Sequence, residues 1–230
     1  MKTILPYPSN LDLHSSTMPN YAQFLDQTPL TSAPLIYING LPSVGKTTVA
    51  RELIRLLGAD NAVLPESHAP IHPVAAKYAC SDSEYQEEGK AERARCFDTY
   101  VKNEEMRDSV AVFTECRSNV GLDAEVAREF QDIAVEARRP FIPILLVCDI
   151  EEHLRRVGTR GQKESSTTEP TSQDMVRHKR ETEELYEFDI DNELILDITH
   201  VRPGTAAKVI VQWVANREWR RRHRDMSRRC

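Results

Sequence analysis

The sequence predicts an α/β domain in which helices flank a five-stranded parallel sheet. Three observations predict this fold. The first two are that short apolar runs recur along the chain and that amphipathic helical patterns separate them. A third is a glycine-rich loop that joins the first apolar run to the first helical pattern. With 230 residues, 40% of them hydrophobic, the chain has the size and apolar content of one globular domain.

The five predicted strands are the apolar runs themselves. Each is short and rich in β-branched or aliphatic residues, as buried parallel strands are. In chain order they are Leu35–Asn39, Ala62–Leu64, Val110–Thr114, Ile142–Cys148 and Leu194–Ile198.

The helices between the strands are predicted from apolar spacing and capping residues. The first helix should end before Gly58, and the apolar spacing from Val126 to Ala137 predicts another. Ser83–Gln86 has the pattern of a capping box and predicts a long charged helix towards Asp108. Two further helices are expected, one capped by Asp149 with Glu152 three residues later, and one from about Thr205 through Trp213.

Composition divides the chain into three parts. Residues 1–33 hold four prolines and no sustained periodicity, which predicts a flexible leader; residues 34–216 form the domain. Residues 217–230 form a basic tail with seven arginines and a net charge of +5, which leaves −11 on the rest of the chain. Inside the domain, residues 158–173 are polar with almost no apolar content, as functional or disordered loops are.

Charge and cysteine content exclude several classes of protein. The acidic body disfavours broad nucleic-acid binding, although the basic tail leaves RNA as a minor option. No apolar run has the length of a membrane span, and Pro6 interrupts any signal-peptide pattern, so a cytoplasmic protein is expected. Five cysteines without a C-x-x-C pair predict reduced thiols rather than disulfides or a zinc site.

The most informative motif is the loop Gly40-Leu41-Pro42-Ser43-Val44-Gly45-Lys46-Thr47, which has the spacing G-x-x-x-x-G-K-T. Between a strand and a helix, its backbone N–H groups and the helix N-terminus form a cradle for phosphate. Lys46 would bridge the β- and γ-phosphates and the Thr47 hydroxyl would bind Mg²⁺. The alternative is a glycine turn before an ordinary helix.

This loop, continued to Thr48, resembles the P-loop of the adenylate, shikimate and gluconate kinases and of chloramphenicol phosphotransferase. It looks closest to uncharacterised AAA-domain proteins of similar length, and the resemblance covers about residues 34–216. The family often has glycine where this chain has Ser43, a difference that a negative φ would accommodate. The resemblance implies ATP and Mg²⁺, and we predict the strand order 2-3-1-4-5 with the P-loop after the central strand and ligands beyond the carboxyl ends of the strands.

Glu115 and Arg117, at the end of the third strand, are candidates beside the P-loop. Glu115 would hold Mg²⁺ waters or orient an acceptor hydroxyl, although the resembling kinases usually have aspartate there. Arg117 would clamp an anionic acceptor or the γ-phosphate. The alternatives are a solvated acid and a surface ion pair.

The remaining candidates come from the resemblance. A segment of about residues 155–173 resembles the lid of such kinases, which makes Arg156 and Arg160 candidates for closing over the triphosphate. Thr199 and Arg202 are weaker candidates for lining an adenine pocket. The family's catalytic aspartate after the second strand is replaced here by His72, so the general base stays open among Glu66, His68, His72 and Glu115.

These features lead to the expectation of a phosphotransferase that uses ATP and acts on a small hydroxyl- or phosphate-bearing acceptor. Three alternatives stay open: an NTPase or switch without an acceptor, a degenerate nucleotide-binding protein, and an RNA-directed kinase that uses the arginine tail. GTP is disfavoured because the chain lacks a guanine-reading Asn/Thr-Lys-x-Asp run.

Overall fold

The computed structural model describes residues 32–65, 83–161 and 172–227, apart from the side chains of 83–85, 160–161 and 217–227. In these ranges five strands pair in parallel in the order β2-β3-β1-β4-β5, which confirms the predicted topology. The strands are β1 (Leu35–Asn39), β2 (Ala62–Val63), β3 (Val110–Glu115), β4 (Phe141–Val147) and β5 (Leu194–Asp197). β1 is central, and its last residue Asn39 lies opposite Glu115 of β3 and Leu145 of β4.

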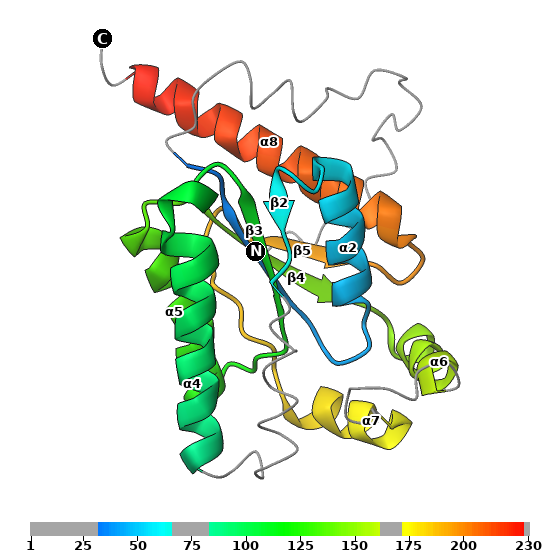
Figure 1. Ribbon diagram of the computed structural model, residues 1–230. Coiled ribbons are helices and arrows are strands. Elements are labelled where there is room, and N and C mark those ends of the chain that lie inside the picture. The colour runs from blue at the N-terminus through cyan, green and yellow to red at the C-terminus, as the bar shows by residue number, and fades with distance from the viewer. Residues whose placement is uncertain (1–31, 66–82, 162–171, 228–230) are drawn as a thin grey trace.

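Alternation along the strands sends side chains to two separate cores, one on each face of the sheet. On one face, Ile36 and Ile38 join a cluster with α2 (Lys46–Leu57) and α8 (Pro203–Ser227). On the other, Leu35 and Tyr37 join a cluster that contains several aromatic rings, together with α4 (Ser83–Phe97) and α5 (Gly121–Glu136). Figure 1 shows α2 and α8 on one side of the strands and α4 and α5 on the other.

Two helices lie beyond the carboxyl ends of the strands (Figure 1). They are α6 (Ile150–Gly161), which includes the first residues of the predicted lid, and α7 (Gln173–Thr182), which begins at its last residue. Residues 158–161, predicted to belong to a polar loop, are therefore helical. The predicted cap of α6 is confirmed, because the Asp149 carboxylate accepts a 2.8 Å hydrogen bond from the Glu152 N–H. Leu154 and Val157 of α6 pack on Val176 of α7, so the two helices share a small core of their own.

The expectation of one long helix towards Asp108 is wrong. α4 ends at Phe97, and the chain continues as the π-helical turn η1 (Asp98–Lys102) and the 3₁₀ turn η2 (Glu104–Met106). A tertiary contact stops the helix here, because the guanidinium of Arg139 donates to the carbonyl groups of Tyr100 and Val101, which a continued α-helix would need for the N–H groups of residues 104 and 105.

Helix α7 was not predicted, and α8 is longer than expected. Ser172 caps α7 by accepting from the Met175 N–H at 3.1 Å, and Val176 is its one buried residue. One buried position is too weak a signal for a helical period. α8 runs to Ser227, beyond the predicted end at Trp213 and into the arginine-rich segment.

Two further expectations fall partly within the described ranges. Cys96, Cys116 and Cys148 are free thiols, as predicted for reduced cysteines. None of the helices in the described ranges combines the length and apolar content that a membrane crossing requires. The leader up to residue 31 and the lid residues 162–171 lie outside the described residues.

Candidate active site

The glycine-rich loop joins the central strand β1 to α2, which is the setting that its spacing predicts. Gly40 lies so close to β4 that a Cβ there would come within 2.9 Å of the Leu146 carbonyl oxygen. Gly45, the N-cap of α2, has a φ of 119°, which L side chains rarely adopt. Both glycines are therefore required by the loop geometry.

Lys46 holds its ammonium group against the loop. The side chain is buried, and its Nζ donates to the carbonyl oxygens of Gly40 at 2.8 Å and Leu41 at 2.9 Å. Bonds to neutral carbonyls are weaker than charge-assisted bonds to anionic oxygens. A phosphate at the N-terminus of α2 would therefore be a better acceptor for this ammonium than the carbonyls are.

The expectation of a negative φ at Ser43 is wrong. Ser43 has a φ of 62°, in the left-handed region that costs about 1 kcal/mol or more for a residue with a Cβ. Its Oγ is also buried without a hydrogen-bond partner among the described residues. Such an unsatisfied hydroxyl in the loop fits a missing ligand oxygen, so the residues present are compatible with a bound phosphate.

Asn39, which the sequence reasoning missed, connects the P-loop to the candidates after β3. Its Oδ1 accepts from the N–H groups of Gly40 at 3.0 Å and Arg117 at 2.9 Å. Its Nδ2 donates to the carbonyl oxygens of Arg117 at 3.0 Å and Tyr186 at 3.2 Å. An amide at the last position of the strand, just before Gly40, was the available signal for this role.

Glu115 and Arg117 lie together, and Asp123 joins them. Arg117 donates to Glu115 Oε2 from Nε at 3.0 Å and to Asp123 Oδ1 from Nη1 at 3.0 Å. Glu115 is 4% exposed. Burial lowers the pKa of Arg117, but the Glu115 charge and the Asp123 hydrogen bond outweigh that effect, so its pKa is raised. The guanidinium thus stays charged between two carboxylates at the end of β3.

Arg156 of α6 joins three segments at the carboxyl edge of the sheet. Its Nη1 donates to the Val44 carbonyl of the P-loop at 2.8 Å, and its Nη2 donates to the carbonyls of Ile198 at 2.7 Å and Thr199 at 3.1 Å. Its Nε bonds Glu152 at 2.7 Å. The structure therefore places Arg156 between the P-loop and the loop after β5, which was expected to line an adenine pocket.

Other predicted residues fall into two groups. Thr199 donates to Asp197 and accepts from the Asp149 N–H, so its hydroxyl joins the ends of β4 and β5, whereas Arg202 is exposed at the start of α8. Four other candidates lie outside the described residues: the side chain of Arg160, and all of Glu66, His68 and His72.

Thr47 is partly exposed in the first turn of α2, and Thr48 is exposed beside it. Within the described ranges, no group of three His, Cys, Asp or Glu side chains could hold a metal ion by itself. Proteins usually bind Mg²⁺ through one or two oxygen ligands together with phosphates and water, and the Thr47 hydroxyl and the Glu115 carboxylate are ligands of that kind.

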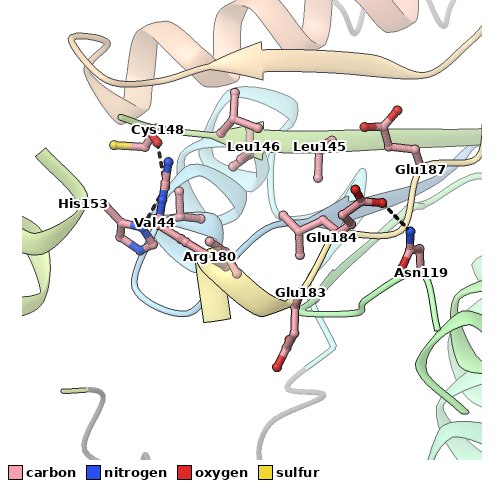
Figure 2. Close-up of a pocket in the computed structure, with 13 residues that line it drawn as sticks. Val44, Asn119, Leu145, Leu146, Cys148, His153, Arg180, Glu183, Glu184 and Glu187 are labelled. Carbon is pink, nitrogen blue, oxygen red and sulfur yellow. Dashed lines mark hydrogen bonds between the residues drawn. The ribbon is translucent and has the colours of Figure 1, made fainter. Parts of the chain in front are cut away.

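A cavity of about 590 Å³ lies beside the P-loop, within the usual size range for small-molecule sites. Its wall combines P-loop, β4 and α6 residues with α7 and the segment that follows it, as Figure 2 shows. Arg180 extends there between His153 and Cys148, and Glu184 accepts from the Asn119 amide at 2.8 Å.

Comparisons with known proteins agree with this geometry. The AAA domain family model matches residues 36–183. The cytidylate kinase of Pyrobaculum islandicum is 29% identical over an alignment 196 residues long, gaps included, and the alignment covers 78% of this chain and 92% of that protein.

Solved kinase structures have the same fold. A Sinorhizobium meliloti gluconokinase is 11% identical with a TM-score of 0.52, covering 84% of this chain and 99% of that one. A Janibacter sugar kinase is 15% identical (TM-score 0.51; 79% and 94% covered). The Mycobacterium tuberculosis APS kinase, solved with AMPPNP and APS, is 14% identical (TM-score 0.51; 80% and 99% covered). The fold of this chain is thus that of the P-loop kinases.

Proposed function

We propose that this chain, which belongs to the AAA domain family, transfers the γ-phosphoryl group of ATP to a small acceptor that carries a hydroxyl or a phosphate. The observation that carries the proposal is the P-loop itself. It combines Gly40 and Gly45 in the required geometry, a buried Lys46 ammonium across the loop, and an unsatisfied Ser43 hydroxyl.

The loop amides and Lys46 would bind the nucleotide phosphates, as the charge of an ammonium and a helix N-terminus favours. Thr47 and Glu115 would hold Mg²⁺, which neutralises charge that develops on the phosphates. Glu115 lies next to the loop because it is paired with Asn39, the residue before Gly40.

Positive charge around the reacting phosphate would come from Arg117, with Arg156 and Arg160 at the base of the lid. The acceptor would lie near Arg117 and Glu115, beyond the carboxyl ends of β1 and β3. The first acceptor to test is cytidine monophosphate, because one relative is a cytidylate kinase.

The test measures ADP release with ATP and Mg²⁺, with and without an acceptor from a panel that starts with cytidine monophosphate. We expect ADP release that depends on the acceptor, with a phosphorylated product detected by mass. Lys46→Ala should lower turnover about a thousandfold while the circular dichroism spectrum stays native, because a charged phosphate contact is removed.

Each alternative has its own outcome. Equal ADP release without any acceptor would indicate an NTPase, and nucleotide binding without turnover on any acceptor would indicate a degenerate binding protein. Binding of RNA with a steep salt dependence would indicate an RNA-directed activity of the tail. Full activity in Lys46→Ala would contradict the proposal.

A further inference from the structure

His153 of α6 is a fully buried titratable residue to which the proposed function gives no role. Its ring lines the cavity beside the P-loop, next to Val44 (Figure 2). Burying a polar ring costs free energy unless its nitrogens are hydrogen-bonded, and both nitrogens of His153 have partners.

The first partner belongs to the P-loop. His153 Nε2 lies 2.7 Å from the carbonyl oxygen of Pro42, which is 111 residues away in sequence. That carbonyl belongs to the peptide unit between Pro42 and Ser43. Because a trans peptide is planar, fixing its C=O direction also fixes the Ser43 N–H on the opposite side.

The same peptide precedes the strained residue of the loop. Ser43 has a φ of 62°, and rotation of the peptide before it changes this angle. Strained conformations of this kind persist only where neighbouring structure holds them. The bond from His153 supplies such a restraint at the loop position where glycine is common in resembling proteins.

The second partner determines which ring nitrogen carries the proton. Arg180 Nη1 lies 3.4 Å from His153 Nδ1 and 2.9 Å from the Cys148 carbonyl oxygen. A carbonyl only accepts and a guanidinium only donates, so the ring must be neutral, with its hydrogen on Nε2. Arg180 thus orients the ring for donation to Pro42.

Arg180 reaches the ring because α6 and α7 pack together. Leu154, Val157 and Val176 form the contact, and Gln173 Nε2 donates to the Leu154 carbonyl at 3.0 Å. The helix after the predicted lid is therefore connected through Arg180 and His153 to the phosphate-binding loop.

We propose that His153 is a positioning residue for nucleotide binding: its Nε2–H fixes the Pro42–Ser43 peptide, and Arg180 fixes the ring tautomer that makes this donation. The inference rests on the proposed function, because it assumes that the loop binds nucleotide phosphates. His153 itself does not contact the nucleotide.

The charges around the ring favour its neutral form. The pKa of His153 is lowered from its ordinary value of 6.5, and burial is the largest cause. The hydrogen bond to Pro42 raises this pKa, whereas the positive charges of Arg180, Lys46 and Arg156 lower it further. The same cavity is also lined by Cys148, which follows β4, and by Glu183, Glu184 and Glu187, which follow α7. Protonation would turn Nδ1 into a donor facing the Arg180 guanidinium, so acid should disrupt the arrangement.

The test compares two substitutions that each preserve one nitrogen position. The amide nitrogen of His153→Gln reaches the Nε2 position and can still donate to Pro42, whereas that of His153→Asn reaches only the Nδ1 position. We expect the Kd of the full chain for AMPPNP with Mg²⁺, measured by calorimetry, to stay within twofold in His153→Gln. It should rise about fivefold to tenfold in His153→Asn.

Three controls separate the possible outcomes. Equal weakening in both variants would indicate packing alone and overturn the inference, as would no weakening in either. His178→Gln and His178→Asn, at an exposed site on α7, should leave the Kd unchanged. Wild-type chain that does not bind AMPPNP would instead contradict the proposed function.

If His153→Asn does not fold, the pH dependence of the Kd for AMPPNP is measured for the wild-type protein and for His153→Gln instead. The ratio of the wild-type Kd to the His153→Gln Kd cancels the ionisation of the nucleotide. We expect this ratio to be constant at and above neutral pH and to rise below the ordinary histidine pKa, about 6.5. A ratio that does not change with pH would overturn the inference.

Discussion

Arg139 and Arg156 both donate hydrogen bonds to backbone carbonyls, at opposite edges of the sheet. Arg139 precedes β4 and donates to backbone carbonyls at the amino ends of the strands, including those of Ala33 before β1 and Ser109 before β3. Arg156 donates to carbonyls beyond the carboxyl ends, those of Val44 after β1 and Ile198 after β5. Each guanidinium thereby joins segments that are distant in sequence.

The two arginines differ in how their charge is balanced. Arg139 is 5% exposed, and burial, followed by the nearby Arg107 charge, lowers its pKa to about 10. Arg156 keeps 21% of its side chain exposed and is paired with the Glu152 carboxylate. At the amino edge, the charge of the Arg139 guanidinium is therefore balanced mainly by carbonyl dipoles. At the carboxyl edge, the charge of Arg156 is balanced by the Glu152 carboxylate, and this ion pair is partly exposed beside the P-loop.

This difference separates stability from function. Among the described residues, no proposed ligand lies at the amino edge, and the carbonyls there would lose a donor if Arg139 were removed. At the carboxyl edge, the same type of contact positions loops that the proposed nucleotide would touch. We therefore expect substitutions of Arg139 to change the free energy of unfolding, and substitutions of Arg156 to change nucleotide affinity.

The largest expected effect on stability is that of Arg139→Met. It leaves several buried carbonyls without a donor, so the free energy of unfolding should fall by about 3 kcal/mol or more, measured by urea denaturation. Arg138→Met, at the exposed neighbouring position, is the matched control and should change it by less than about 0.5 kcal/mol. Equal stability of the two variants would contradict the comparison.

A smaller effect on stability is expected from Arg156→Met, about 1 to 2 kcal/mol, because part of its side chain is solvated. Its Kd for AMPPNP should rise about tenfold, since the carbonyls of Val44 and Thr199 lose their common donor. Arg155→Met is the matched control, because Arg155 is 65% exposed and bonds only Glu152 among its described side-chain partners. If both variants bind equally well, Arg156 does not position these loops.

The smallest effect concerns Glu152, the carboxylate that is paired with Arg156. Hydrogen bonds from Arg155, and then from Arg156, lower the pKa of Glu152 from 4.5 to about 2. The unfolded chain therefore takes up this proton first, so the stabilisation is present above about pH 4.5 and is lost as pH falls towards 2. Because the pair is near the surface, Glu152→Gln should cost less than about 1 kcal/mol at neutral pH, and the difference should shrink on acidification. A difference that stays constant with pH would show that the pair does not contribute.

Features that depend on neighbouring residues could be predicted from the sequence. The spacing of Gly40, Gly45 and Lys46 predicted the strand–loop–helix junction, and Asp149 predicted the cap of α6. The apolar runs predicted all five strands, and the order predicted beside the family resemblance is confirmed. The roles of the site residues stay predictions that the proposed experiments test.

Features that depend on distant residues could not be predicted. The end of the helix near Lys102 depends on a contact with Arg139, about 40 residues later, and the contacts of Asn39 reach Arg117 and Tyr186. The sign of φ at Ser43 was predicted wrongly because nothing near it in sequence indicates the surroundings that hold the strained form.

By itself, the sequence determined the phosphate-binding motif, the strands and their parallel arrangement, because hydrophobic period, glycine spacing and capping act over a few residues. The tertiary structure alone decided which buried groups meet at each edge of the sheet. A buried donor must find an acceptor wherever the chain supplies one, so the partners of Asn39, Arg139, His153 and Arg156 are set by packing rather than by sequence distance.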